Sequence, residues 1–250
     1  MSMSVDGAFI YFTIPIFGGI PITQTTVSHL IVTIFLCTVC IVLGKRLTKR
    51  PNGVQVMVEK GVMMVRNMVV ETMGEHNAHW TPFIATIFLS SICGSFIGLT
   101  GFLRSSTADL SCTLVWALMV TAIIWYHNIK NNGFLGWLKG FTEPIVVMTP
   151  MNVISEIAQP VSMAFRHFGN IASGSVITAL IYGGLSALSS LVLGLLPGAF
   201  GDVISQIPIF DFGIPAILSL YFDFFSSVLQ AFIFCMLTMM YIGGAAETDG

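Results

Sequence analysis

The sequence predicts an all-α, polytopic membrane protein with five crossings, an interfacial helix and a long, tilted helix hairpin. Of its 250 residues, 55% are hydrophobic and only 9% are charged, and the mean hydropathy is +0.88. Soluble domains carry about 25% charged residues. The composition therefore excludes a disordered chain and a basic nucleic-acid-binding protein, and it disfavours an ordinary soluble enzyme. Several apolar segments also reach the roughly 20 residues that a membrane-spanning helix needs.

Three apolar segments are predicted to be simple crossings, and they are residues 27–44, 81–103 and 110–127. The second begins with Thr81 and Pro82, and proline is favoured in the first turn of a helix. Residues 1–26 are predicted to be an external N-terminal segment. We find no internal repeat, soluble domain or low-complexity linker, so we expect residues 1–250 to form a single membrane domain.

Three further segments do not look like simple crossings. Residues 54–73 are apolar on one side but also carry charged residues, which predicts a helix at the membrane interface or packed on the bundle. Residues 145–197 and 213–244 are apolar for longer than one crossing needs, and they are predicted to form two long helices. The pair Gly183-Gly184 offers a place for the first of these to bend.

The basic residues are predicted to lie on one side of the membrane. Eight of the ten Lys and Arg residues lie in 45–80 and 128–144, which fall on the same side if residues 81–127 form a two-span hairpin. Because basic loops are retained in the cytoplasm, we place both stretches there. The N-terminus is then outside, the C-terminus is cytoplasmic, and the loop 198–212 is outside.

Arg166 is the basic residue predicted to lie inside an apolar span. An ionised arginine near mid-bilayer costs roughly 2.5–3.5 kcal/mol on insertion scales, so it must face a partner, water or the bundle interior. Other polar residues follow at helical spacing on the same face: Ser155, Gln159, Ser162, Asn170 and Ser173. A structural ion pair is one interpretation, but hydroxyls and amides around a fixed cation favour a hydrated ion path.

The last predicted helix carries a second polar face, formed by Asp223, Ser226, Ser227 and Gln230. A carboxylate among apolar side chains suggests an ion pathway, although a buried, hydrogen-bonded acid is the alternative. If Arg166 and Gln230 lie at the same depth in antiparallel helices, Asp223 lies about 10 Å further out. On the first helix, Ser175 lies about 13 Å further out and Glu156 about 15 Å toward the cytoplasm.

Three motifs resemble those of one family, subunit a of the bacterial F-type ATP synthases. The segment PVSMAFRHFGNIASGSV at 160–176 resembles the family signature S-L-x-x-R-L-F-G-N. The segment LQAFIFCMLTMMYIGGA at 229–245 resembles its C-terminal signature, L-Q-A-[FY]-[IV]-F-x-x-L-x-x-x-Y. The segment TADLSCT at 107–113 resembles T-A-D-[LV]-N-x-T. The resemblance covers nearly the whole chain, and the first two motifs together are very specific.

The resemblance implies roles for individual residues. Arg166 matches the arginine that faces the carboxylates of a rotating ring of c subunits, the c-ring. Asn170 and Gln230 match two amides of the same motifs. Asp109 matches the acid of the third motif, and Glu156 matches an acid found ten residues before the arginine in many members.

The chain departs from the family pattern at three positions. His167 replaces the usual leucine, Ser111 replaces the usual asparagine, and Ser175 stands where many bacterial members have glutamate. We infer that Asp223 takes over the role of an acid in the outer channel. We expect His167 to be a packing residue, since adjacent residues on a helix point about 100° apart.

The resemblance implies a non-catalytic stator subunit of the F0 motor, with two offset half-channels that carry H⁺ or Na⁺ to and from the c-ring carboxylates. It also implies two ring-facing helices, 145–197 and 213–244. The implied partners are the c-ring, peripheral-stalk subunit b and membrane lipid, with no nucleic acid, and the implied location is a bacterial inner membrane. A self-contained ion channel or a secondary transporter is the alternative, but it would require paired intramembrane charges or internal repeats.

Two short motifs suggest a metal or redox site but do not support one. Cys37 and Cys40 lie within one apolar run, and the sequence has no second pair of this kind. The segment 75–79, Glu-His-x-x-His, has the wrong order for a zinc-protease motif and no third ligand nearby. We therefore expect no metal and no cofactor.

Overall fold

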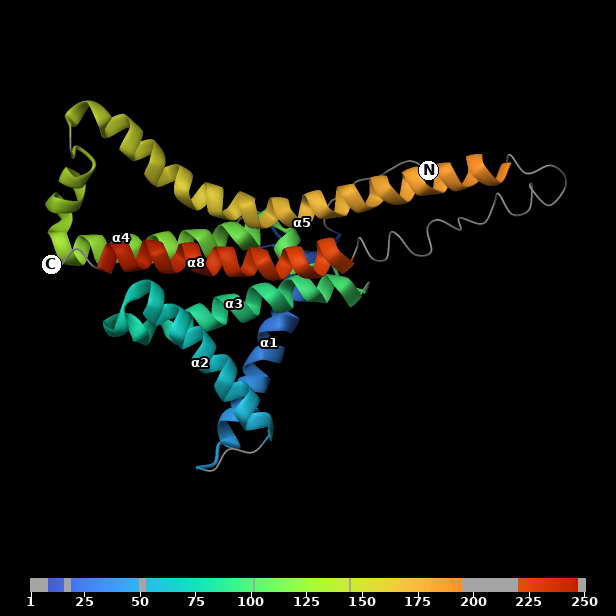
Figure 1. Ribbon diagram of the computed structural model, residues 1–250. Coiled ribbons are helices and arrows are strands. Elements are labelled where there is room, and N and C mark those ends of the chain that lie inside the picture. Colours follow the sequence, from blue (N-terminus) through green and yellow to red (C-terminus); the bar gives the residue numbers. More distant parts are fainter. Residues whose placement is uncertain are drawn as a thin grey trace.

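The described part of the chain is a bundle of long helices with one short β-hairpin (Figure 1). The computed structural model describes residues 9–15, 19–49, 53–100, 102–143, 145–194 and 220–246. Its elements are β1 (Ile10–Ile14), β2 (Ile20–Thr23), α1 (Gln24–Lys45), α2 (Gly53–Met73), η1 (Glu75–Trp80), α3 (Thr81–Phe96), η2 (Ile97–Thr100), η3 (Ser106–Ala108), α4 (Leu110–Gly140), η4 (Val146–Met148), α5 (Thr149–Gly194), η6 (Leu220–Phe225) and α8 (Ser226–Ala246). Figure 1 shows α3, α4, α5 and α8 running alongside one another, while α1 and α2 project from them.

Four stretches of the described residues are long and apolar enough to cross a membrane, and they are Gln24–Lys45, Leu110–Gly140, Val146–Leu188 and Ser226–Ala246. Helix α3 has 16 residues and is about 24 Å long, which is shorter than the roughly 30 Å core of a bilayer. The structure thus confirms a helical, polytopic membrane protein. The number of crossings and an interfacial position for residues 54–73 stay predictions.

Two predicted crossings have different ends in the structure. The segment 81–103 was expected to be one helix, but α3 ends at Phe96 and continues as the 3₁₀ turn η2. The segment 110–127 corresponds to α4, which continues to Gly140 across a kink at Gly133. Gly133 has φ 70°, a backbone conformation that glycine adopts without a steric penalty.

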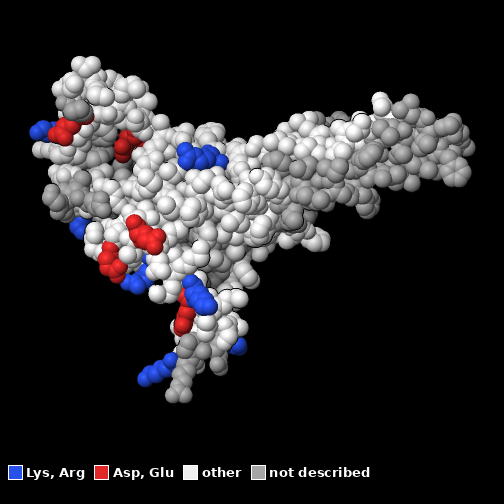
Figure 2. All heavy atoms as spheres, viewed as in Figure 1, with Lys and Arg blue, Asp and Glu red and all other residues white. Residues whose placement is uncertain are grey.

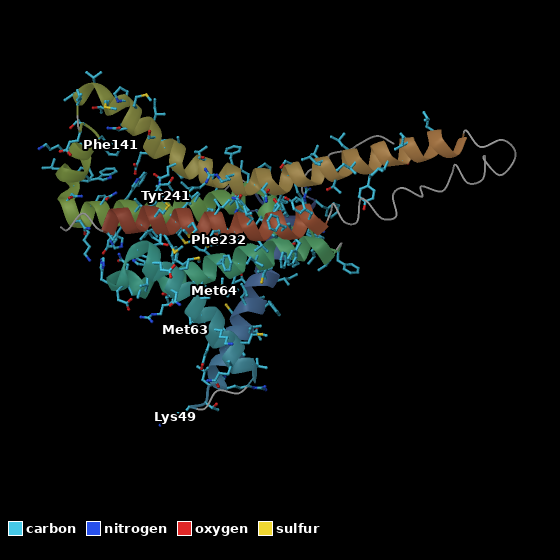
Figure 3. The ribbon with its side chains drawn as sticks, in the orientation of Figure 1. Lys49, Met63, Met64, Phe141, Phe232 and Tyr241 are labelled. Carbon is cyan, nitrogen blue, oxygen red and sulfur yellow. The ribbon has the colours of Figure 1, made fainter. Side chains whose placement is uncertain are left out.

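Helix α2 coincides with the predicted amphipathic segment, and one end of it packs on the bundle. Val69 and Met73 are fully buried, and α2 contacts both α3 and α8 there. A Cβ atom at Gly243 of α8 would lie 3.4 Å from the Met73 side chain, which is van der Waals contact, so α2 and α8 are closely packed here. Figure 3 shows the side chains of Met63 and Met64 along the projecting part of α2, with Lys49 at its far end.

The N-terminal segment contains a hairpin that the sequence analysis did not predict. Strands β1 and β2 pair antiparallel, and Gly19, just before β2, has φ 96°. The backbone N–H of Gln24 donates to the carbonyl of Phe9 at 2.9 Å, which joins the hairpin to the start of α1. Each strand has five residues or fewer, so the alternation of side chains was too brief to be recognised.

The contacts at each end of the bundle define the helix directions. At one end, Asn131 of α4, just before the kink at Gly133, donates to the carbonyl of Ala245 near the end of α8 at 3.2 Å, and earlier in both helices the ring centroid of Trp116 lies 6.3 Å from that of Phe234, so these helices are parallel. At the other end, Phe96 stacks on Phe224 with ring centroids 5.0 Å apart. A core of buried apolar side chains lies between α2, α3, α4, α5 and α8. Helix α5 begins at the end of the bundle where α8 finishes, so α5 and α8 are antiparallel.

Candidate functional site

Arg166 and His167 lie on different faces of α5. Arg166 is exposed, whereas the side chain of His167 is only 1% exposed. Pro160, Met163 and Ala164 share the buried side. Helix α5 therefore rests on the bundle through the face that contains His167, and it presents the arginine outward. The sequence analysis expected a packing residue here, and the structure places His167 in the buried face of α5.

The polar residues that share a face with Arg166 follow the outward side of α5. Ser155, Ser162 and Ser173 are exposed, and Gln159 and Asn170 are partly exposed. Among the described residues, Arg166 has no hydrogen bond and no ion pair. A structural ion pair, the alternative considered from the sequence, thus finds no partner for Arg166 in this part of the chain.

Charged side chains are sparse on the surface near this helix. Figure 2 shows most of them over α2 and toward the end of the bundle where α8 finishes, and one separate basic patch over α5, while much of the remaining described surface is uncharged. Large apolar side chains on α5, among them Phe165 and Leu180, are more than half exposed. An arginine that faces outward from a long apolar helix must meet water or a polar or charged partner, because its charge is costly in lipid.

Asn170 and Ser226 set the register between α5 and α8. Ser226 Oγ donates to Asn170 Oδ1 at 2.6 Å, and Asn170 Nδ2 donates to the carbonyl of Ser226 at 3.2 Å. Because the helices are antiparallel, four residues back along α5 and four residues forward along α8 lead to Arg166 and Gln230. These two residues therefore lie at one level of the bundle, which is the register assumed for the sequence alignment of the two helices.

Gln230 turns into the bundle rather than toward the exposed face. Its side chain is 7% exposed, and its Nε2 has no hydrogen-bond partner among the described residues. Ser227, one turn earlier, is also buried. A buried amide without a partner costs about 1–3 kcal/mol, so packing alone does not account for glutamine here.

Glu156 is joined to α4 on the side of Arg166 where α5 begins. The indole Nε1 of Trp125 donates to Glu156 Oε1 at 2.5 Å, and the glutamate remains partly exposed. Ten residues of helix separate Glu156 from Arg166, a rise of about 15 Å. Glu156 and Arg166 therefore lie on the same helix but do not contact each other.

Asp109 has a structural role that the sequence analysis did not identify. It caps α4, since its Oδ1 accepts from the Ser111 N–H at 2.9 Å, and its Oδ2 accepts from Thr25 Oγ1 at 2.7 Å. Asp109 also lines a cavity of about 270 Å³ between α1 and α4. His29 also lines this cavity. The ring centroid of Trp116 lies 5.9 Å from that of His29 and 5.9 Å from that of His167. Asp109 thus joins α1 to α4, away from the outward face of α5.

The side chains of Ser175 and Asp223 lie outside the described residues. Their backbones are helical, with Ser175 in α5 and Asp223 in the π-helix η6. The roles expected for these two residues stay predictions. The end of the long segment 145–197 beyond residue 194 and the start of 213–244 before residue 220 are also outside the described part.

The structure adds one contact for which the sequence gave no signal, between α3 and α5. Ser91 Oγ lies 3.0 Å from His167 Nε2, and both side chains are buried. The replacement of leucine by histidine indicated an unusual position, but nothing in the sequence identified Ser91 as its partner. The described residues contain no group of three or more His, Cys, Asp or Glu side chains that could hold a metal ion.

Comparison with known proteins identifies the family of the chain. Residues 26–243 match the model of the family described as ATP synthase A chain. The chain is 32% identical over 242 residues to the sodium-ion-specific ATP synthase subunit a of Propionigenium modestum, which covers 91% of this chain and 75% of that protein. It is 32% identical over 242 residues to ATP synthase subunit a of Anoxybacillus flavithermus, covering 92% of this chain and 95% of that protein.

A third relative is ATP synthase subunit a of Bacillus subtilis, which is 29% identical over 245 residues and covers 93% of this chain and 96% of that protein. The match extends over most of the chain, including the outward arginine of α5, the glutamine of α8 and the Asp109 cap. The chain belongs to the ATP synthase A chain family, the subunit a of the membrane F0 sector.

Proposed function

We propose that this chain is the stator subunit through which ions pass to and from the c-ring of a rotary ATP synthase. The observation that carries the proposal is the outward arginine on α5, which has no partner among the described residues and lies level with a buried glutamine on α8. A fixed cation on an apolar helix suits a surface that a partner's carboxylates pass one after another.

Arg166 would act by electrostatics alone. A nearby cation favours the ionised form of a carboxylate, so Arg166 would lower the pKa of a passing ring carboxylate and promote release of its ion. The same charge would repel a cation that tried to pass directly between the two half-channels. Arginine suits this task because its guanidinium stays charged at any physiological pH. One charge crossing 100 mV yields about 2.3 kcal/mol, so several ions must cross for each ATP.

The remaining polar residues would divide between the two half-channels. Asp223 would supply the acid of the outer channel, at nearly the depth of Ser175, and Glu156 would lie on the cytoplasmic exit. Asn170 and Gln230 would flank the arginine where the channels approach the ring. Asp109 would contribute mainly by holding the start of α4.

We place the chain in a bacterial inner membrane with five crossings, the N-terminus outside and the C-terminus cytoplasmic. Residues 54–73 would lie at the cytoplasmic interface, and the segments 145–197 and 213–244 would face the ring. Peripheral-stalk subunit b and lipid would cover other apolar faces, such as the exposed Leu30, Ile34 and Phe35 of α1. The chain would itself make no covalent bond.

The direct test is reconstitution of F0 with and without this chain. Vesicles that contain the c-ring, subunit b and this chain should conduct H⁺ or Na⁺ under an imposed potential, and omission of the chain should abolish the flux. With the F1 sector added, imposed ΔpH and ΔpNa would show which ion drives ATP synthesis. If the chain alone conducts as well as the full F0, it is a self-contained channel and the proposal fails.

A further inference from the structure

We propose that His167 is a positioning residue that fixes the rotation of α5 and so holds Arg166 toward the ring. This inference rests on the function proposed for Arg166. It concerns a residue at which the chain departs from the family signature, where leucine is usual.

The imidazole of His167 is held by three different helices. Its Nε2 is 3.0 Å from Ser91 Oγ of α3. The rings of Trp116 in α4 and Phe234 in α8 approach it edge-on, at centroid distances of 5.9 and 5.5 Å and interplanar angles of 64° and 70°. The ring therefore cannot turn or slide without breaking a contact to one of these helices.

These contacts constrain Arg166 because the two residues are adjacent on one helix. Side chains one residue apart keep an angle of about 100° about the helix axis, so the direction of His167 determines that of Arg166. The other buried residues on this face, Met163 and Ala164, make apolar contacts, which have no preferred direction. The hydrogen bond to Ser91 is directional, so it adds a specific restraint on rotation to the burial of this face.

Packing alone does not explain a histidine at this position. The second ring nitrogen, Nδ1, is buried and has no hydrogen-bond partner among the described residues. An unsatisfied buried polar atom carries a free-energy cost that leucine would avoid. The bond between His167 and Ser91 must therefore offer something that leucine does not, and a fixed direction for the adjacent arginine is what the geometry supplies.

A second anchor, three residues further along α5, adds a restraint along the helix axis. The reciprocal hydrogen bonds between Asn170 and Ser226 join α5 to α8 and set how far one helix lies along the other. The bond from His167 joins α5 to α3 instead. Together the two anchors determine both the level and the direction of Arg166.

The test uses the intact ATP synthase in vesicles and compares four single variants. His167→Leu removes the hydrogen bond, and His167→Gln keeps an amide within reach of Ser91. Ser91→Ala removes only the partner hydroxyl. Ser95→Ala is the matched control, because Ser95 lies one turn further along α3 and bonds to Thr107 at 3.0 Å, away from His167.

Two quantities are measured, the rate of ion-driven ATP synthesis and the yield of a disulfide between Ser162→Cys and a cysteine in the carboxylate-bearing helix of the ring. Ser162 is exposed one turn before Arg166, and the parent chain, which has five cysteines, gives the background. Misplaced reacting groups lose about ten-fold to a hundred-fold in rate, so His167→Leu and Ser91→Ala should lower synthesis by about ten-fold. Both should also lower the disulfide yield several-fold, while His167→Gln and Ser95→Ala stay near the parent level.

Unchanged synthesis and unchanged disulfide yield in both His167→Leu and Ser91→Ala would overturn the inference. If His167→Leu fails to assemble, Ser91→Ala decides alone, because it deletes a single buried oxygen. Equal loss in His167→Gln and His167→Leu would also count against it, since the hydrogen bond would then be irrelevant. Arg166→Ala separates the two proposals. If Arg166→Ala still couples ion flow to ATP synthesis, the proposed function fails. If Arg166→Ala does not couple but His167→Leu works normally, only the positioning role of His167 fails.

Discussion

At the scale of single residues, adjacent side chains in this protein have opposite environments and separate tasks. Arg166 is exposed and His167 is buried, which the angle of about 100° between neighbours on a helix allows. Asp109 matches an acid of a family motif, yet in the structure its carboxylate makes two hydrogen bonds that hold the fold. A residue's motif therefore does not reveal whether it acts on ions or on the fold.

Two substitutions distinguish a structural role of Asp109 from a role in ion transport. Asp109→Ala removes the cap of α4 and the bond to Thr25, and loss of a cap costs about 0.5–2 kcal/mol. Asp109→Asn keeps a capping oxygen, so it should retain most of the stability and nearly normal ion transport. The measurements are unfolding in detergent and ATP-driven ion uptake by vesicles. A complete loss of uptake in Asp109→Asn, with stability intact, would show that its charge serves the ion path.

The charge of Asp223 is predicted to serve ion entry, and the residue is not expected to be needed for the fold. Asp223→Asn keeps the shape and hydrogen-bonding capacity but removes the charge, so ion entry should slow by about ten-fold with assembly intact. Adding Ser175→Glu should partly restore the rate, because both positions lie at nearly the same depth. Ion pumping is measured across a range of pH. Unimpaired pumping by Asp223→Asn at every pH would place the outer channel elsewhere.

At the scale of elements, the register of α5 on α8 is the feature on which the site depends. Residue spacing predicted both helices and their polar faces. The common depth of Arg166 and Gln230 was an assumption of the helix alignment. The structure supplies the contact that sets this depth, between Asn170 and Ser226. Spacing predicts which face of a helix is polar, but it cannot identify the partner across a tertiary contact.

The Asn170–Ser226 pair should behave as one coupled unit. Each of Asn170→Ala and Ser226→Ala should destabilise the subunit by about 1 kcal/mol, the usual net value of a hydrogen bond. The double variant should lose little more than either single one, because both delete the same interaction. Unfolding by denaturing detergent measures the free energies. Fully additive losses would mean that the two side chains act independently.

At the scale of the whole molecule, hydropathy and charge predicted the membrane class and most helices, but not all their ends. Helix α3 is shorter than the expected 81–103 because the chain forms 3₁₀ turns after Phe96. Element α4 is longer than the expected 110–127 because a second helical segment follows the non-helical Gly133. The β-hairpin was missed because its strands are very short. Local backbone geometry of this kind depends on neighbouring elements, which hydropathy does not report.

The five-crossing topology predicts that residue 202, in the loop 198–212, faces outward. Asp202→Cys should therefore react with a membrane-impermeant thiol reagent added from outside and not from the cytoplasmic side. The same reagent on the parent chain, with its five cysteines, gives the background. Labelling only from the cytoplasmic side would overturn the orientation, which rests on the eight of ten basic residues that lie in 45–80 and 128–144.

Arg166 provides the most direct test of the account, since every proposed step depends on its charge. In reconstituted vesicles, Arg166→Ala should abolish ion-driven ATP synthesis while the complex still assembles, and it should raise passive ion leakage because the barrier between the half-channels is lost. Arg166→Lys should be nearly as defective, since lysine is a compact and more strongly hydrated cation. Normal coupled synthesis by an assembled Arg166→Ala complex would contradict the account.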